Sequence, residues 1–283
     1  MTTTPAGSMA NLLDAIVASA RCTVEARRIQ EPESQLEKRA ARCEPRAAVF
    51  RDALARPGRV NVIAECKRRS PARGVLRHDY HPGAIAQMYQ DNGASAVSVL
   101  TEPAFFDGSL SHLEEVRAAV TLPLLRKDFV VDRYQLLEAR AAGADAVLVI
   151  VAACSTADLT SLIGSAHAWG LAALVEAHSA DEIRRAVDAG ATIIGVNSRS
   201  LKTLDVNLRT CDALVGEIPP GCVAVAESGI GSAQDVGHLT SIGYQAVLIG
   251  EWLMSAADPG ATLRAISGLT GIGPGKRCVE GGR

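Results

Sequence analysis

Eight short apolar runs, each followed by a stretch with helical periodicity, occupy the chain after residue 58. Such alternation is typical of βα units, which assemble into a parallel sheet. Eight consecutive units favour closure of that sheet into a barrel over an open sheet. The sequence therefore predicts an α/β protein with the (β/α)8 TIM-barrel fold. The predicted strands span residues 60–65, 95–100, 122–126, 145–151, 171–175, 192–196, 222–226 and 246–249.

An internal repeat supports this count of strands. The segments DNGASAVSVL, AAGADAVLVI, DAGATIIGV and SIGYQAVLIG recur roughly every fifty residues, about the length of two βα units. In each segment a glycine ends the helical pattern and lets the chain turn into the next strand. Residues 1–57 differ, because they are rich in charge and helical patterns and end at Pro57-Gly58. We therefore expect an N-terminal helical extension over residues 1–57.

Charge and composition exclude several classes of protein. A formal net charge of −2 over 283 residues gives no electrostatic footprint for nucleic acid or an anionic membrane. The longest apolar run, residues 146–154, is about half the length of a membrane-spanning helix, and the polar start of the chain does not resemble a signal peptide. Seven scattered cysteines and six histidines form no pattern of metal ligands. We expect a cytoplasmic protein with reduced thiols and no bound metal, as a monomer or weak homo-oligomer.

Charged residues end the odd-numbered predicted strands. Glu65 and Lys67 follow the first strand, Lys127 the third, Glu176 the fifth and Glu227 the seventh. Alternate strands of a barrel contribute to the same interior layer, and active sites lie at the carboxyl ends of the strands. Burying isolated ions costs several kcal/mol each, so packing alone does not explain four such positions. The pattern predicts an acid/base site in the barrel mouth, although a structural ion pair between Glu65 and Lys67 is the alternative.

Lysine is rare in this chain, which makes these positions more informative. Only five of the 29 basic residues are lysines, and two of these are Lys67 and Lys127. Where only positive charge is needed, the chain uses arginine. A lysine at the end of an apolar strand therefore indicates a need for an amine, whose pKa can be tuned and which can donate a proton.

Two glycine-containing turns follow the last two predicted strands, at AESGIGS (226–232) and LIGEW (248–252). Backbone amides of such turns, at the start of a helix, form an anion site. Barrels frequently bind phosphate with the loops after strands seven and eight. We therefore expect a phosphorylated small-molecule substrate, the alternative being glycine placed there for steric reasons alone.

Seven segments resemble the motifs of one known family. IAECKRRSP, SVLTEPAFFDGS, LLRKDFVVDRYQ, LVEAH, IGVNSRSL, VAESGI and LIGEWLM are similar, in order and spacing, to motifs of indole-3-glycerol-phosphate synthase. The resemblance runs over residues 10–268. It implies a barrel over residues 58–268, with the helical extension of residues 1–57 covering the mouth. Residues 269–283 match nothing in the family, and we expect a flexible tail there.

The resemblance also implies a reaction and a set of site residues. The reaction closes the indole ring of 1-(2-carboxyphenylamino)-1-deoxyribulose 5-phosphate and releases carbon dioxide and water, in tryptophan biosynthesis, without a cofactor. The implied catalytic residues are Glu65, Lys67, Lys127, Glu176, Asn197 and Ser228. The implied substrate-binding residues are Ser70, Phe106, Phe129, Arg199 and Glu227. The implied phosphate-binding residues are Gly229, Gly250 and Glu251.

The chemistry of ring closure suggests individual roles. We expect Lys127 to be the general acid at the ketone oxygen, because neighbouring carboxylates favour its charged form. Lys67 would hold the benzoate carboxylate, and Glu176 would receive or return a proton during dehydration. Phe106 and Phe129 could clamp the aromatic ring. Which lysine delivers which proton is left open by the sequence.

Two alternatives remain at this point. A Schiff-base aldolase would use Lys127 as a nucleophile toward a sugar-phosphate carbonyl. A non-catalytic barrel would merely bind a sugar phosphate, but its expected mark, the loss of a key acid or base, is absent from the sequence.

Overall fold

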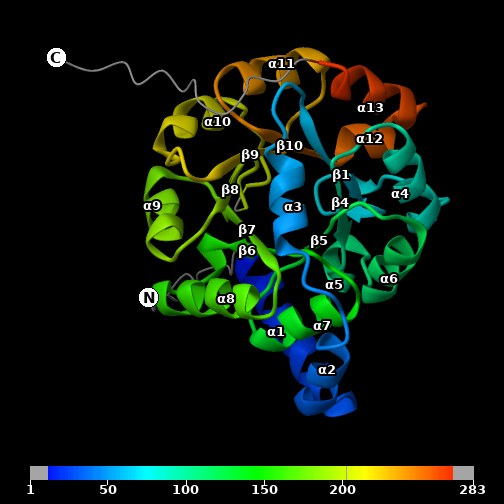
Figure 1. The fold of residues 1–283 in the computed structure, drawn as a ribbon, viewed down its shortest axis with the longest axis vertical. Coiled ribbons are helices and arrows are strands. Elements are labelled where there is room, and N and C mark those ends of the chain that lie inside the picture. Colours follow the sequence, from blue (N-terminus) through cyan, green and yellow to red (C-terminus); the bar gives the residue numbers. More distant parts are fainter. Residues whose placement is uncertain (1–11, 202, 270–283) are drawn as a thin grey trace, which may run out of the picture.

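Eight parallel strands form a closed barrel in the computed structural model, which describes residues 12–201 and 203–269 (Figure 1). Each strand pairs with its neighbours in chain order, and the last strand pairs with the first. The predicted TIM-barrel fold is thus confirmed. The barrel strands are β1 (Asn61–Cys66), β4 (Ala96–Leu100), β5 (Leu124–Lys127), β6 (Ala146–Ile150), β7 (Ala172–Ala177), β8 (Ile193–Asn197), β9 (Val223–Glu227) and β10 (Ala246–Ile249).

Helices surround the barrel on the outside, and shorter elements lie in its loops (Figure 1). The outer helices are α4 (Pro82–Asp91), α6 (Leu110–Ala119), α7 (Arg133–Ala141), α8 (Thr156–Ala168), α9 (Ala180–Asp188), α10 (Arg209–Leu214), α11 (Ala233–Ser241) and α13 (Pro259–Ser267). The loop elements are the β2 (Arg69–Ser70) and β3 (Gly74–Val75) hairpin, α5 (Pro103–Phe106), α12 (Glu251–Ser255), η1 (Val151–Ala153) and η2 (Val215–Glu217).

Side-chain caps fix where most of these helices begin. In each case an oxygen accepts a hydrogen bond from a backbone N–H in the first turn, which typically stabilises a helix start by about 1 kcal/mol. Placing each helix start also fixes the loop before it, and three of these loops, before α6, α7 and α11, carry expected site residues. The capping residues are Ser109, Asp132, Ser155, Ser179, Ser232 and Asp258.

Several strands extend further than the apolar runs predicted. Lys127, Glu176, Asn197 and Glu227 lie inside their strands, because the backbone ladder continues past the apolar residues. For example, Glu176 is in register with Ile150 on β6, and Asn197 with Glu227 on β9. Apolar patterning misplaced these strand ends, since the polar side chains point into the mouth rather than out to solvent.

Two apolar layers build the core. One lies between the strands and the outer helices, and it includes Cys66 and Tyr89. The other fills the barrel interior, where Ile63, Leu125, Leu174 and Val225 share one cluster. These four interior residues each stand two positions before a charged residue on the odd-numbered strands of the barrel. The charged side chains therefore lie one layer above the packed apolar interior of the barrel.

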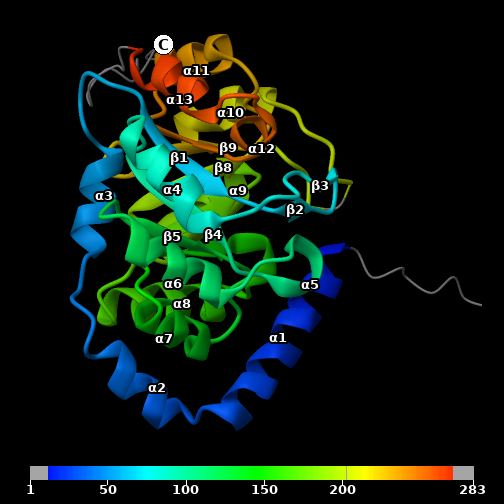
Figure 2. The same ribbon diagram turned by 90° about the vertical axis from the view of Figure 1, so that its right-hand side faces the viewer.

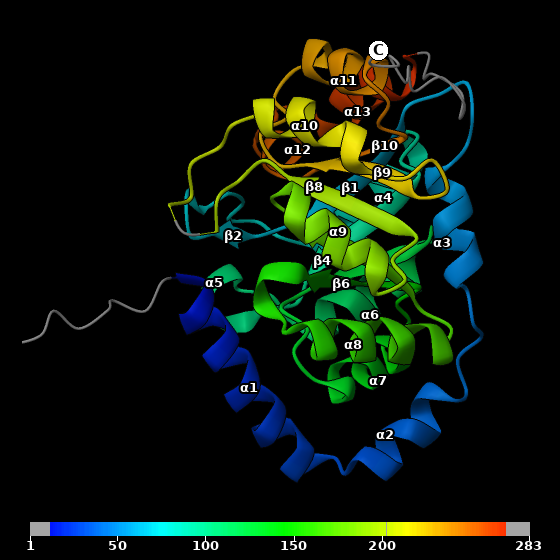
Figure 3. The same cartoon turned by 90° about the vertical axis from the view of Figure 1, so that its left-hand side faces the viewer.

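The N-terminal segment forms three helices with different positions: α1 (Leu12–Gln30), α2 (Glu33–Ala40) and α3 (Ala47–Leu54). The start of α1 lies near α5, at the mouth, and α2 packs against α7 (Figures 2 and 3). In contrast, α3 lies at the opposite end of the barrel, where Phe50 and Leu54 join the interior cluster. Among the described helices of residues 1–57, α1 therefore borders the mouth, whereas α2 and α3 bury their apolar faces elsewhere.

Two further predictions concern membrane-spanning helices and the C-terminal tail. No helix within residues 12–201 and 203–269 is both long enough and apolar enough to cross a membrane. The predicted tail, residues 269–283, lies outside the described residues except for Leu269, whose carbonyl accepts a hydrogen bond from Val60 N–H.

Candidate active site

A cavity opens at the carboxyl ends of the strands. All fourteen site residues expected from the sequence line it, together with apolar residues from the barrel and from α1. The structure therefore brings all of these residues together around a single cavity. They are Glu65, Lys67, Ser70, Phe106, Lys127, Phe129, Glu176, Asn197, Arg199, Glu227, Ser228, Gly229, Gly250 and Glu251.

Two lysines and three carboxylates form a charged cluster in this cavity. Lys67 Nζ lies 2.6 Å from Glu65 Oε2. Lys127 Nζ lies 3.6 Å from Glu176 Oε2 and 3.8 Å from Glu227 Oε2. The three carboxylates are almost fully buried, with at most 3% of each residue exposed. The Glu65–Lys67 ion pair exists, but it borders the cavity rather than closing the barrel.

The charged cluster shifts the pKa values of Glu65 and Lys127 in the directions that favour their charged forms. Burial alone would raise the pKa of Glu65, but the ammonium groups of Lys67 and Lys127 outweigh burial and hold that pKa below its ordinary value. Burial alone would lower the pKa of Lys127, but the neighbouring carboxylates raise it above its ordinary value. Lys127 is therefore protonated at neutral pH.

Glu227 behaves differently from Glu65. Burial, together with the like charge of Glu176, raises the pKa of Glu227 to about 8. The site thus contains a fully charged ammonium next to a carboxyl group that readily takes up a proton. Such a combination of perturbed groups in one cavity is typical of acid/base sites.

The oxygens of Glu176 and Glu227 lack hydrogen bonds. Within the described ranges, neither oxygen of either carboxylate has a hydrogen-bond partner. A buried polar atom without a partner costs about 1–3 kcal/mol, so native proteins seldom retain four of them without a function. These oxygens are available to a substrate.

Two glycines make room for the buried carboxylates. A Cβ atom at Gly250 would clash with Glu65 and stand 2.8 Å from its Cδ. A Cβ atom at Gly195, on β8, would clash with Glu227 and stand 3.0 Å from its Cδ. Gly250 therefore has a packing role at the site besides any contact with phosphate. Gly195 was not among the residues predicted from the sequence, although a glycine inside an apolar strand is a signal of close approach.

We expect Gly250→Ala to lower kcat/KM by about 100-fold, since a displacement of about 1 Å at a catalytic site can have such an effect. The backbone at Gly250 has a φ of −121°, which alanine also adopts, so the added methyl group acts through Glu65. Gly164→Ala, on α8, is a matched control, because a Cβ there meets nothing within 4 Å. Steady-state kinetics of both variants measure the difference. Wild-type kcat/KM in Gly250→Ala would contradict the packing role.

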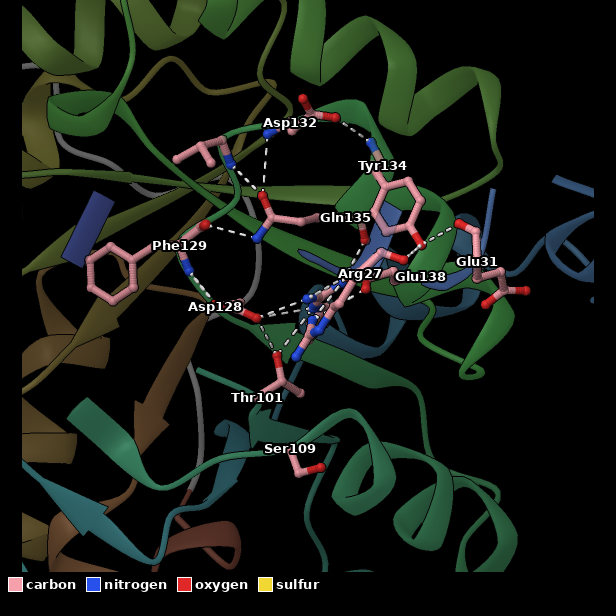
Figure 4. Close-up of polar contacts among 12 residues, drawn as sticks. Arg27, Glu31, Thr101, Ser109, Asp128, Phe129, Asp132, Tyr134, Gln135 and Glu138 are labelled. Atoms are coloured by element: carbon pink, nitrogen blue, oxygen red, sulfur yellow. Dashed lines mark hydrogen bonds and ion pairs between the residues drawn. The ribbon is translucent and has the colours of Figure 1, made fainter. Parts of the chain in front are cut away.

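Two phenylalanines form an apolar wall of the cavity. The rings of Phe106 and Phe129 have centroids 6.2 Å apart and are tilted by 35°. Figure 4 shows how the Phe129 backbone is fixed: its N–H donates to Asp128 Oδ1 at 2.8 Å, and its carbonyl accepts from Gln135 Nε2 at 3.0 Å. Hydrogen bonds to both the N–H and the carbonyl of Phe129 thus fix the backbone that carries the ring.

A buried ionic network supports this loop from behind (Figure 4). Arg126, on the outer face of β5, is fully buried and pairs with Asp128 at 2.9 Å and Glu138 at 3.1 Å. Arg27 on α1 also pairs with Glu138, at 3.2 Å. The network connects α1 to the strand that carries Lys127. This network was not predicted from the sequence, because apolar patterning places the end of a strand at a charged residue even when that residue lies on the outer face.

The loops after β9 and β10, which are expected to bind phosphate, line the cavity. Ser228 and Gly229 both have positive φ, 66° and 75°, and a side chain at Gly229 would collide with Val206. A positive φ in a serine is uncommon and often marks a functional site. The Glu251 carboxylate, however, pairs with Arg73 at 2.7 Å and Arg199 at 3.1 Å. Since a carboxylate repels phosphate, only the backbone of Glu251 is suited to contact one.

The apolar lining was also absent from the sequence-based set. Leu12, Leu13 and Ile16 of α1 and Leu148 and Ile150 of β6 border the cavity. The spacing of Leu12 and Ile16 by one helical turn was the available signal. No group of His, Cys, Asp or Glu within residues 12–201 and 203–269 is arranged to hold a metal ion.

The chain is similar in sequence to indole-3-glycerol phosphate synthases, and similar in fold alone to other barrel enzymes. The family model described as indole-3-glycerol phosphate synthase matches residues 13–266. Indole-3-glycerol phosphate synthase 2 of Streptomyces coelicolor is 47% identical over 260 residues, covering 92% of this chain and 100% of the relative. Indole-3-glycerol phosphate synthase of Arthrobacter sp. (strain FB24) is 49% identical over 255 residues, covering 88% and 92%. Among solved structures, 3-hexulose-6-phosphate synthase from Salmonella typhimurium shares the fold, with a TM-score of 0.61 and 16% identity over 74% of this chain and 97% of that chain.

Proposed function

Because this chain belongs to the indole-3-glycerol phosphate synthase family, we propose that the charged cluster of its barrel mouth carries out the family's ring closure. The chain is a carboxy-lyase of tryptophan biosynthesis. Its substrate, 1-(2-carboxyphenylamino)-1-deoxyribulose 5-phosphate, gives indole-3-glycerol phosphate, carbon dioxide and water. The observation that carries the assignment of the site is the pairing of a charged Lys127 with Glu176 in one cavity, at 3.6 Å.

Lys127 is the proposed general acid. Ring closure needs a proton on the ketone oxygen while a ring carbon attacks the ketone carbon. Three carboxylates keep the Lys127 ammonium charged in a nearly buried place, and a positioned acid typically accelerates such a step by about 10²–10⁴-fold.

Glu176 is the proposed partner for the later proton transfers. After carbon dioxide leaves, the hydroxyl departs as water and a ring proton is removed to form indole. Both oxygens of Glu176 are buried without a hydrogen bond in the described part of the chain, so no hydrogen bond has to be broken before a substrate proton is accepted there. Glu227, with its pKa of about 8, shares protons within the same cluster.

The remaining residues hold the substrate in this proposal. Lys67, paired with Glu65, binds the benzoate carboxylate, and Phe106 and Phe129 clamp the aromatic ring. Asn197 accepts a hydrogen bond from the Arg199 backbone N–H at 2.9 Å through its Oδ1. Its amide N–H groups then serve as donors to a substrate oxygen.

A direct assay tests the proposal. Purified protein incubated with the carboxyphenylamino substrate is expected to produce indole fluorescence at a rate proportional to enzyme concentration. Borohydride added during turnover separates this mechanism from the aldolase alternative, since a trapped adduct on Lys127 would support a Schiff base. Absence of indole, or such an adduct, would reject the proposed chemistry.

The phosphate site gives a second test. A substrate without its 5-phosphate is expected to have a KM at least about 100-fold higher, because each lost charge-assisted hydrogen bond contributes about 1.5–3 kcal/mol. The loops at Gly229 and Gly250 are the proposed donors. Equal KM values for the two substrates would reject the phosphate assignment.

We also propose a cellular compartment and an oligomeric state for the protein. None of the six described cysteines forms a disulfide, which fits a cytoplasmic protein. A monomer or a weak homo-oligomer remains the proposed state, to be measured by sedimentation.

A further inference from the structure

Each turnover of the proposed reaction takes up one proton. The substrate carboxylate leaves as neutral carbon dioxide and the ketone oxygen leaves as water, so one proton comes from solvent. Lys127 supplies the first proton, to the ketone. Glu176 in its acid form can supply the second, to the departing hydroxyl, and its carboxylate can then return the ring proton to Lys127. The cycle closes only if Glu176 receives a proton from outside a cavity that the substrate fills.

His178 lies behind Glu176, at the end of β7. Its Nε2 is 3.7 Å from Glu176 Oε1, while Lys127 faces the other oxygen of that carboxylate. Nε2 is buried and has no hydrogen-bond partner among residues 12–201 and 203–269. The two residues follow the spacing of Glu65 and Lys67, two positions apart at the carboxyl end of a strand.

On the other side of the imidazole, His178 Nδ1 faces Glu182, in the first turn of α9. Nδ1 of His178 lies 3.4 Å from Glu182 Oε2, and the same oxygen accepts the His178 backbone N–H at 2.7 Å. Glu182 is in turn fixed by its backbone N–H, which donates to Ser179 Oγ at 3.2 Å. A carboxylate that orients a histidine toward a reacting group is a known catalytic arrangement.

Exposure increases along this series of side chains. The side chain of Glu176 is 1% exposed, that of His178 18% and that of Glu182 20%. The series thus leads from the buried carboxylate toward solvent without passing through the cavity.

The charges around His178 raise its pKa. Burial lowers the pKa of His178, but Glu182 on α9, Glu176 on β7 and Glu227 on β9 together raise it above its ordinary value of 6.5. Burial raises the pKa of Glu182, but His178 and Arg185 together hold it below its ordinary value. Histidine is the side chain suited to exchanging protons near neutral pH.

We propose that His178 acts through Glu176, as a positioning and proton-relay residue that delivers solvent protons to the buried carboxylate. The imidazolium gives its Nε2 proton to Glu176 Oε1 and keeps the Nδ1 proton that faces Glu182. Exchange with solvent at the Glu182 side then restores the imidazolium. The inference rests on the proposed role of Glu176.

His178→Asn is the central test, because its amide can replace the Nδ1 donor to Glu182 while nothing replaces Nε2. We expect kcat to fall about ten-fold or more at pH 7, with little change in KM. Wild-type kcat should decrease above the pKa of His178, and this limb of the pH profile should disappear in the variant. His238→Asn is the matched control, since His238 lies on the exposed face of α11, paired with Asp212, and it should keep the wild-type profile.

Two further variants separate the possible outcomes. His178→Gln carries an N–H toward Glu176 but cannot cycle a proton, so we expect the same loss; wild-type kcat and pH profile in either His178 variant would overturn the relay. Glu176→Gln should be inactive. An active Glu176→Gln would instead overturn the role proposed for Glu176, which distinguishes failure of the function from failure of the relay.

Discussion

Lys127→Ala is expected to lower kcat/KM for indole formation by about 10³-fold or more, while the barrel stays folded. The general acid itself accounts for about 10²–10⁴-fold. The change also removes the nearest cation from Glu176 and Glu227, at 3.6 and 3.8 Å. Lys127 opposes the burial that raises the pKa of Glu227, so its removal raises that pKa further and disturbs the cluster in addition to removing the acid.

Lys127→Arg separates the two effects. A guanidinium keeps the positive charge beside the carboxylates, but its pKa is too high for proton donation. We expect the arginine variant to remain folded, as judged by circular dichroism, and to be nearly as inactive as the alanine variant. Lys38→Ala, on the exposed face of α2, is the control for lysine removal and should have wild-type kinetics. Near wild-type turnover in Lys127→Ala would reject the acid role.

Glu227→Gln is expected to stabilise the fold, and to do so more at high pH. The pKa of Glu227 is 4.5 as a reference and about 8 in the folded protein. Between these values the folded state binds more protons than the unfolded state, so stability falls as pH rises from about 4.5 to 8. The difference corresponds to roughly 5 kcal/mol above pH 8 and vanishes below pH 4.5. A glutamine avoids this cost because it stays neutral.

Thermal denaturation at pH 5 and pH 9 measures this effect. The gain in Tm of Glu227→Gln over wild type should be much larger at pH 9, while kcat/KM falls because an amide cannot exchange a proton with the cluster. Glu44→Gln, at an exposed position, is the control and should shift Tm equally little at both pH values. An equal or larger gain at pH 5 would show that Glu227 is not held protonated by burial. Stability and activity would thus be opposed at one residue.

The barrel and its charged mouth could be predicted because both follow from local periodicity. Strand period two places Glu65 and Lys67 on one face, and alternate strands place Lys127 and Glu176 beside them. Nothing beyond the order of residues is needed for that inference, and the observed register agrees with it.

Other features depend on contacts that periodicity does not encode. Arg126 is buried only because Glu138, from α7, and Asp128 neutralise it. Glu251 faces arginines because Arg73, in the hairpin after β1, reaches across to it. His178 had the same spacing after Glu176 as Lys67 after Glu65, but only the packing of α9 shows that Glu182 orients it. Each of these needs a partner from another part of the chain.

The position of α3 has a consequence for biosynthesis of the protein. Phe50 and Leu54 leave the ribosome before any barrel strand, yet their cluster includes Ala246 and Leu248 of the last strand. These two apolar side chains therefore have no complete binding site until nearly the whole polypeptide has been made. Native contacts of such large sequence separation form slowly and leave apolar surface exposed in the meantime. The nascent chain should consequently depend on chaperones until the eighth βα unit emerges.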